Sequence, residues 1–202
     1  MIIAKLTRWG GIAILVAGVL LIAAEILYMF FPDAGSQIMS LPGRIFGTLC
    51  MAGAVLLTAG LIGFYLRQAE AAGTFGLVAF LVALTGSALM ICSDWNELFV
   101  GPTLSQIPGL EESFPTLLIA GFLMNVGVYI LGWVLLGIAS FRARVFPRPL
   151  AIVLAIGAPV LLIHIPGSSL PLYIVFAWMG LEVVRDKLVA PHSIPASAAT
   201  SV

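Results

Sequence analysis

The polar side chains that could do chemistry in this chain are few, and most are acidic. Asp94, Glu97, Glu111 and Glu112 lie in one segment, residues 93–114, which carries no Lys or Arg. Brought together, their oxygens would suit a hard cation such as calcium. The dense Asp-x-Asp-x-Asp-Gly spacing of calcium loops is absent, however. We therefore interpret the segment as a solvated acidic outer loop, able to act as a lid or contact surface, and predict no metal there.

Asn125 is an isolated amide inside a long apolar run. It follows Thr116 by nine residues, which places it about 14 Å along a helix and near the middle of a membrane. An amide facing lipid at that depth would be costly, so Asn125 either contacts a ligand or bonds another helix. Pro159 leaves the carbonyl of Ala155 without its usual helical donor. We favour a hydrogen bond from Asn125 to that carbonyl over a substrate or ion site.

Two more ionisable side chains fall within or beside apolar runs. Glu25 follows Arg8 by seventeen residues, about 25 Å along the first run. We expect it to reach the outer surface or to pair with Arg44, rather than to carry a proton or bind a cation. His164 ends the fifth run, and one histidine cannot supply both axial ligands of a b-type haem. We interpret His164 as an interfacial hydrogen-bonding group and predict no cofactor.

These polar groups belong to a chain of 202 residues that is 61% hydrophobic and 9% charged, with a mean hydropathy of +1.17. Soluble domains carry about 25% charged residues, so the composition indicates an integral membrane protein whose partner is the lipid bilayer. The formal net charge is zero. The chain therefore lacks the basic patch that nucleic-acid binding requires, and nucleic acid is excluded as a partner.

Six apolar runs, bounded by Pro, Gly and charged residues, predict an all-α fold, a polytopic bundle of six transmembrane helices. The last two runs are short, so they form either two short spans or one re-entrant hairpin. We expect residues 1–189 to form a single transmembrane domain and residues 190–202, rich in Ala, Ser and Pro, to form a disordered cytoplasmic tail. The predicted spans are residues 9–31, 44–66, 73–92, 115–140, 150–165 and 170–184.

The distribution of cations predicts the orientation of the chain. Lys and Arg concentrate in the short cytoplasmic loops of membrane proteins. With the N-terminus inside, eight of the nine cations fall on the inner side and only Arg44 lies outside. We therefore expect a protein of the cytoplasmic (inner) membrane with both termini in the cytoplasm. The eight inner cations are Lys5, Arg8, Arg67, Arg142, Arg144, Arg148, Arg185 and Lys187.

Small and sulfur-containing residues give two further expectations. Cys50 and Cys92 lie at different predicted depths, too far apart for a disulfide, so both are predicted to be free thiols. Small residues recur every four positions at Ala79, Ala83 and Ser87. Such a stripe lets helices approach closely. It would pack the core of this bundle, or join the chain to a second copy or to another membrane protein.

Two local patterns resemble a known group of proteins. The turn Arg67-Gln68-Ala69-Glu70 precedes a Gly-rich helix start, and a later Gly-x-Ala stretch runs into an Arg-rich, Pro-containing loop, residues 137–149. In these features, and over most of its spans, the chain resembles an uncharacterised group of small bacterial multi-pass membrane proteins. The resemblance implies a bacterial membrane protein. It carries no activity and no catalytic or binding residue.

The motifs of common enzymes, such as Gly-x-Ser-x-Gly, His-Glu-x-x-His and Cys-x-x-Cys, are absent from the sequence. We therefore do not expect an enzyme. A non-catalytic accessory or interaction protein would be a dry, tightly packed bundle, and this is the interpretation we favour. The alternative is a small-molecule or ion transporter, or a substrate-binding membrane subunit, which would hold a polar cavity near Asn125 and His164.

Overall fold

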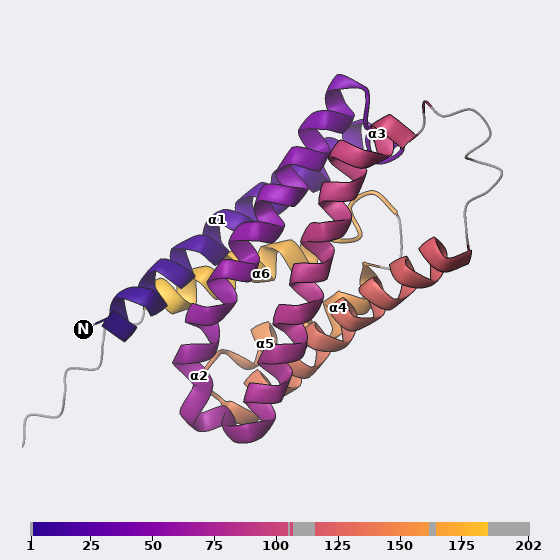
Figure 1. The fold of residues 1–202 in the computed structure, drawn as a ribbon. Helices are drawn as coiled ribbons and strands as arrows, with labels where there is room; N and C mark the ends of the chain where they lie inside the picture. Colours follow the sequence, from indigo (N-terminus) through magenta and orange to yellow (C-terminus); the bar gives the residue numbers. More distant parts are fainter. Residues whose placement is uncertain (1, 105, 107–115, 162–164, 186–202) are drawn as a thin grey trace, which may run out of the picture.

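The computed structural model describes residues 2–104, 106, 116–161 and 165–185, and every regular element within these ranges is helical. The expected tail and three candidate residues, Glu111, Glu112 and His164, lie outside the described residues. Figure 1 shows the arrangement. The elements are α1 (Ile2–Phe30), the 3-10 turn η1 (Pro32–Ala34), α2 (Leu41–Trp95), the π-helical turn η2 (Asn96–Val100), α3 (Gly101–Leu104), α4 (Thr116–Ala143), α5 (Arg148–Val160) and α6 (Leu170–Arg185).

Helix α2 consists of two arms joined at Gly73. The first arm, residues 41–72, and the second arm, residues 74–95, meet where Gly73 has φ 57° and ψ −153°, a conformation that glycine adopts without steric cost. Stacking of Tyr65 on Phe80, 4.4 Å between ring centroids, holds the arms together. The second and third predicted spans therefore correspond to the two arms of α2, which meet at the break at Gly73. Six separate helices are not confirmed, although the predicted boundary at residue 73 coincides with the break.

The second arm continues well beyond the predicted end of its span. Helical structure passes from Trp95 through η2 and α3 to Leu104, so the prediction of a loop is wrong for residues 93–104. Apolar residues such as Leu98 and Phe99 continue into this region and extend the helix. At the π-helical turn η2, the backbone N–H of Gly101 donates to the carbonyl of Asn96. The first part of the acidic segment is therefore helical.

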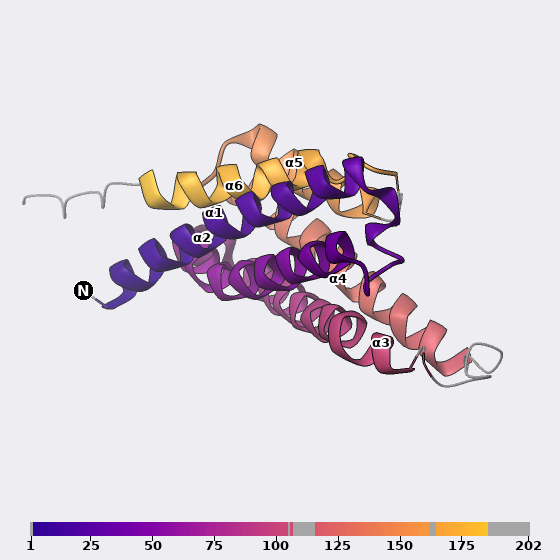
Figure 2. The same ribbon diagram turned by 90° about the horizontal axis from the view of Figure 1, so that it is seen from above.

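Helix α1 lies between the first arm of α2 and α6, as Figure 2 shows from above. Glycines bring the backbones together on both sides. A Cβ added to Gly10 would lie 2.7 Å from the Cα of Gly63, and one added to Gly18 would lie 2.7 Å from the Cα of Ala177. Close approach of this kind is the usual route to tight helix packing in a membrane, where the hydrophobic effect does not drive association.

Helix α6 runs antiparallel to α1. Gly18 meets Ala177, Leu15 meets Gly180 and Gly11 meets Val183, so the order of contacts on the two helices is reversed. The connection that precedes α6 lies beside the C-terminal end of α1, where Gly167 packs against Met29. Helix α6 matches its predicted span to within one residue, whereas α5 ends at Val160 rather than at residue 165.

Helix α4 packs on the second arm through the predicted small-residue stripe. Ala79, Ala83 and Ser87 are all buried inside the chain, and a Cβ on Gly132 would collide with the backbone of Ala83. On its other side α4 meets α5, where Gly137 lies against Ala155. The stripe therefore joins helices within the chain.

The described cations gather at one end of the bundle, which we call the basic end. Arg67 of α2 contacts two other segments there. Its Nη1 donates to the carbonyl of Glu182 in α6, and its guanidinium lies 4.6 Å from the ring centroid of Phe146, between α4 and α5. Arg44 lies at the opposite end, beside the connection from α1 to α2, and we call this the far end. The cations of the basic end are Lys5, Arg8, Arg67, Arg142, Arg144, Arg148 and Arg185.

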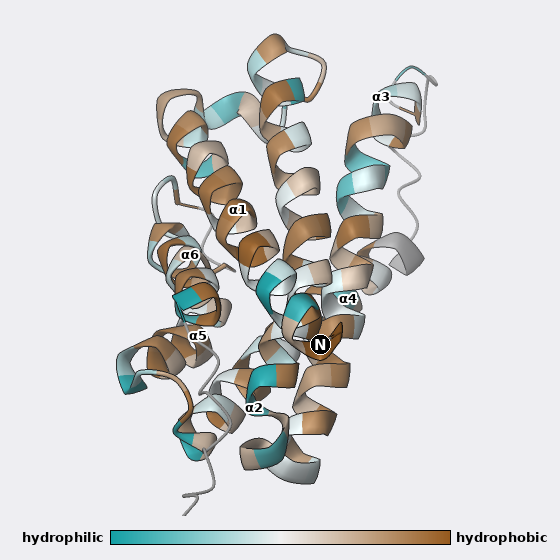
Figure 3. Cartoon of the chain, turned by 90° about the vertical axis from the view of Figure 1, so that its left-hand side faces the viewer, coloured by the Kyte–Doolittle hydropathy of each residue, from teal (hydrophilic) through white to brown (hydrophobic). Residues whose placement is uncertain are grey.

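Three helical stretches of the described chain are long and apolar enough to cross a membrane: Ile2–Phe30, Leu41–Leu104 and Ile119–Ala143. Hydrophobic residues dominate the length of the helices in Figure 3. Many large apolar side chains face outward, among them Val19, Val55, Leu131 and Ile156. Outward apolar surface of this extent is the property of a membrane-embedded protein.

Gly18 and Gly121 provide a matched test of the glycine contacts. Gly18→Ala places a methyl group against the backbone of Ala177, whereas a Cβ at Gly121 meets nothing within 4 Å. We expect Gly18→Ala to lower the free energy of unfolding by about 1–3 kcal/mol through overpacking. Gly121→Ala should raise it by about 0.5–1 kcal/mol, the helix preference of Ala over Gly. Unfolding by SDS titration measures both, and equal effects of the two variants would contradict the packing described.

Candidate functional site

A cavity of about 540 Å³ lies in the far end of the bundle, between α1, both arms of α2, α4 and the start of α6. Exposed lining residues, Gly35, Ser36 and Glu97, form its mouth. Its floor is formed by Leu57 and Ser87, each only 2% exposed. Sites for drug-sized ligands are typically about 300–1,000 Å³ in volume. The cavity is therefore large enough for an organic molecule.

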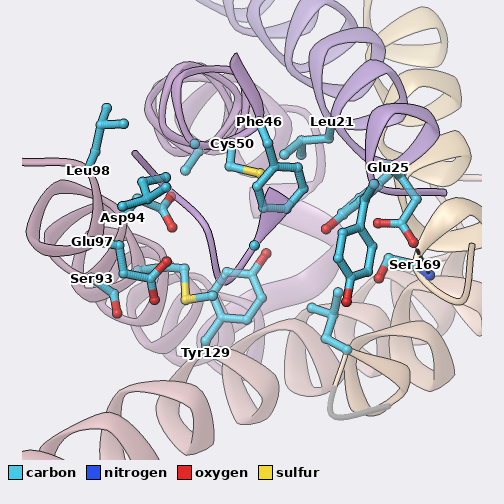
Figure 4. A pocket seen from close by; sticks show the side chains of 18 of the residues that line it. Leu21, Glu25, Phe46, Cys50, Ser93, Asp94, Glu97, Leu98, Tyr129 and Ser169 are labelled. Atoms are coloured by element: carbon cyan, nitrogen blue, oxygen red, sulfur yellow. Dashed lines mark hydrogen bonds between the residues drawn. The ribbon is translucent and has the colours of Figure 1, made fainter. Parts of the chain in front are cut away.

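One face of the second arm and its η2 extension lines the cavity from floor to mouth. The lining residues Ser87, Met90, Asp94 and Glu97 are spaced three, four and three apart, which puts them on one side of a helix. The ten residues from Ser87 to Glu97 span about 15 Å. Figure 4 shows the side chains of Asp94 and Glu97 on one wall. Asp94 and Glu97 thus share one face of this wall.

Glu25 contributes the third carboxylate, from the opposite wall (Figure 4). It is buried, 5% exposed, and its Oε1 accepts hydrogen bonds from the backbone N–H groups of Gly167 at 2.7 Å and Ser169 at 3.5 Å. These groups immediately precede α6, where a helix N-terminus has unpaired N–H donors and favours negative charge. The expected position at the surface or beside Arg44 is therefore wrong, because the start of α6 lies against Glu25.

Aromatic side chains also line the cavity. Tyr28 of α1 and Phe46 of α2 pack with their ring centroids 5.5 Å apart, and Tyr129 of α4 and Tyr173 of α6 complete the lining. Sequence reasoning missed Phe46, Tyr129 and Tyr173. Each lies in an apolar run where an aromatic residue is usually core, and its neighbours across the bundle could not be inferred from the chain alone.

The described lining contains three acidic side chains and no neighbouring cation. Among the described lining residues there is no Lys, Arg or His. Asp94 is half-buried and Glu97 is exposed, and neither carboxylate makes a hydrogen bond or ion pair within the part of the chain that the structure describes. At the floor, the hydroxyl of Ser87 is buried and has no hydrogen-bond partner among the described residues. The cavity thus has polar groups without hydrogen-bond partners among the described residues both on the wall near its mouth and at its floor.

Asn125 lies outside this cavity lining. Its side chain is 8% exposed and Nδ2 donates to the carbonyl of Leu89 in the second arm, at 3.2 Å. The predicted partner was the carbonyl of Ala155, and this prediction is wrong. Ala155 packs instead against Gly137, twelve residues farther along α4. Counting depth from the end of the fifth run failed because α5 is shorter than its apolar sequence.

The structure therefore brings Glu25, Asp94 and Glu97 to one cavity. Asn125 lies instead at the contact between α4 and the second arm of α2. Within the described residues, no group of three His, Cys, Asp or Glu side chains is arranged to hold a metal ion. Cys50 lines the cavity and Cys92 is exposed; both are free thiols, as predicted.

Comparisons with known proteins were made for the whole chain. No protein-family model matches it, and no curated protein or solved structure matches it either. A function must therefore be inferred from the cavity, which combines negative charge, aromatic faces and an unpaired hydroxyl in one enclosed volume. These are groups that bind and orient a small molecule.

The role of Glu25 at the start of α6 can be tested with two substitutions. Glu25→Gln keeps an acceptor oxygen for the N–H of Gly167, whereas Glu25→Leu removes it and leaves buried donors unpaired. We expect Glu25→Leu to lower the free energy of unfolding by about 1.5–3 kcal/mol and Glu25→Gln to lower it less. Hydrogen exchange of residues 165–170 should accelerate in Glu25→Leu. Unchanged exchange there would show that Glu25 does not hold this connection.

Proposed function

We propose that this chain is a small-molecule-binding membrane protein, either a transporter or a substrate-binding membrane subunit, that takes up its ligand from the far end. The cavity of about 540 Å³ with a buried polar floor carries this proposal. An interaction protein built as a dry bundle would have no use for such a volume. The geometry therefore favours the second of the two function classes that the sequence allows.

Dense packing between the cavity floor and the basic end supports uptake from the far end. Phe64 stacks on Phe146 with ring centroids 4.4 Å apart, and the guanidinium of Arg67 lies over the same Phe146 ring. Leu61 and Trp133, above this stack, are fully buried. The cavity is thus accessible from its mouth and sealed toward the basic end, which is the arrangement of an outward-facing binding site.

We further propose that the basic end faces the cytoplasm in the inner membrane of a bacterial cell, with six crossings made by α1, the two arms of α2, α4, α5 and α6. The positive-inside rule supports this orientation, because seven cations gather at the basic end and Arg44 lies at the far end. The antiparallel course of α6 along α1, from the level of Glu25 to that of Gly11, favours two short crossings over a re-entrant hairpin.

A cavity-filling substitution tests the proposed binding function. Ala54 lines the cavity, and Ala59, five residues along the same arm, is exposed. In a thermal-shift screen of cationic, neutral and anionic aromatic compounds, we expect some compounds to raise the Tm of the wild type and of Ala59→Phe. The same compounds should not raise the Tm of Ala54→Phe, because the new ring occupies their site. If no compound of any charge distinguishes these two variants, the cavity does not bind ligands and the proposed function fails.

A further inference from the structure

We propose that the cavity selects organic cations: an ammonium group lies between Asp94 and Glu97, and an aromatic body extends toward the floor and places a polar group beside Ser87. This inference rests on the proposed function and names the substrate class of the same site. Charge, aromatic lining and the orphaned hydroxyl each support it separately.

The charge of the lining favours a cation. Asp94 and Glu97 lie within one turn of each other on the cavity wall, with no cation among the described lining residues to neutralise them. Glu25 adds a third acidic side chain, although its Oε1 is already engaged by the N–H groups before α6. Electrostatic attraction strengthens in a partly enclosed, low-dielectric volume. An anionic ligand would meet repulsion from three carboxylates, and a neutral ligand would leave two of them unpaired.

The rest of the wall suits an organic cation better than a bare metal ion. The described residues contain no cluster of three metal-ligating side chains. Phe46 and Tyr129 lie between the acidic walls in Figure 4, and Tyr28 packs against Phe46 in the same lining. The faces of aromatic rings attract positive groups, and the rings offer apolar area to a ring system. Such walls cannot replace the hydration shell of a small inorganic ion.

The floor adds a requirement at the other end of the ligand. Ser87 lines the floor and is 2% exposed, and its hydroxyl has no partner within the described residues. A buried hydroxyl without a partner is unfavourable, so a ligand that supplies one gains affinity. Ser87 and Asp94 are seven residues apart, about 10 Å along the helix. The preferred ligand therefore carries its ammonium group and a hydrogen-bonding group about 10 Å apart or slightly less.

Three indole compounds of nearly equal shape test the charge preference: tryptamine, a cation; tryptophol, neutral; and indole-3-acetate, an anion. Binding is measured by equilibrium dialysis with the full chain in nanodiscs of zwitterionic lipid, with empty nanodiscs subtracted. We expect the wild type to bind tryptamine at least tenfold more tightly than the other two. Asp94→Asn should remove most of this preference. Asp33→Asn is the matched control, because it removes an exposed carboxylate that does not line the cavity.

The outcomes separate this inference from the proposed function. Equal or tighter binding of tryptophol or indole-3-acetate, or a Tm screen whose hits are neutral or anionic only, overturns the cation class while the binding function stands. An equal loss of tryptamine preference in Asp33→Asn and Asp94→Asn also overturns it, since general surface charge would then account for the effect. If no compound of any charge distinguishes Ala54→Phe from Ala59→Phe, both proposals fail.

The contact at the floor is tested with 5-hydroxytryptamine, which adds a hydroxyl at the far side of the same indole ring. We expect it to bind the wild type more tightly than tryptamine does, by about threefold to tenfold. In Ser87→Ala this advantage should disappear while tryptamine affinity stays within about twofold. An advantage that persists in Ser87→Ala would remove Ser87 from the recognition proposed here.

Discussion

The close contact of helix backbones at glycine holds the helices of this bundle together. In a membrane, apolar side chains gain little by leaving lipid for protein, so van der Waals packing must hold helices together. Glycine pairs supply that packing along α1, where Gly10 meets Gly63 and Gly18 meets Ala177. Gly121 and Gly127 of α4 are exposed, and Cβ atoms there would meet nothing within 4 Å. Close packing is therefore found at the glycines that face another helix.

The same contacts explain why a carboxylate can be buried in this protein. Tight packing of α1 on α6 fixes the start of α6 beside Glu25, and the backbone N–H groups there supply the donors that a buried carboxylate needs. Asp94 and Glu97 have a different environment, on a wall that faces the open volume. One acidic residue therefore maintains the structure of the cavity, and the other two remain available to a ligand.

The sequence predicted the helical class, the positions of most spans and the grouping of cations, because these follow from hydropathy and charge, which are local properties. It did not predict the cavity, whose lining comes from five separate elements and includes aromatic residues that resemble core. The predicted partner of Asn125 was also wrong, because the depth of Ala155 was counted along an apolar run that extends beyond α5, and the actual neighbour is Leu89.

The single-residue turn at Gly73 has a consequence for how the chain enters a membrane. Because Gly73 alone departs from helical geometry between the arms, residues 41–95 form an αα-hairpin whose connection requires almost no loop-closure entropy. Few backbone groups are left without helical partners at such a turn. The two arms are thus suited to insert together as one preformed unit. The cavity wall that carries Asp94 and the wall that carries Cys50 would then reach the bilayer in the same step.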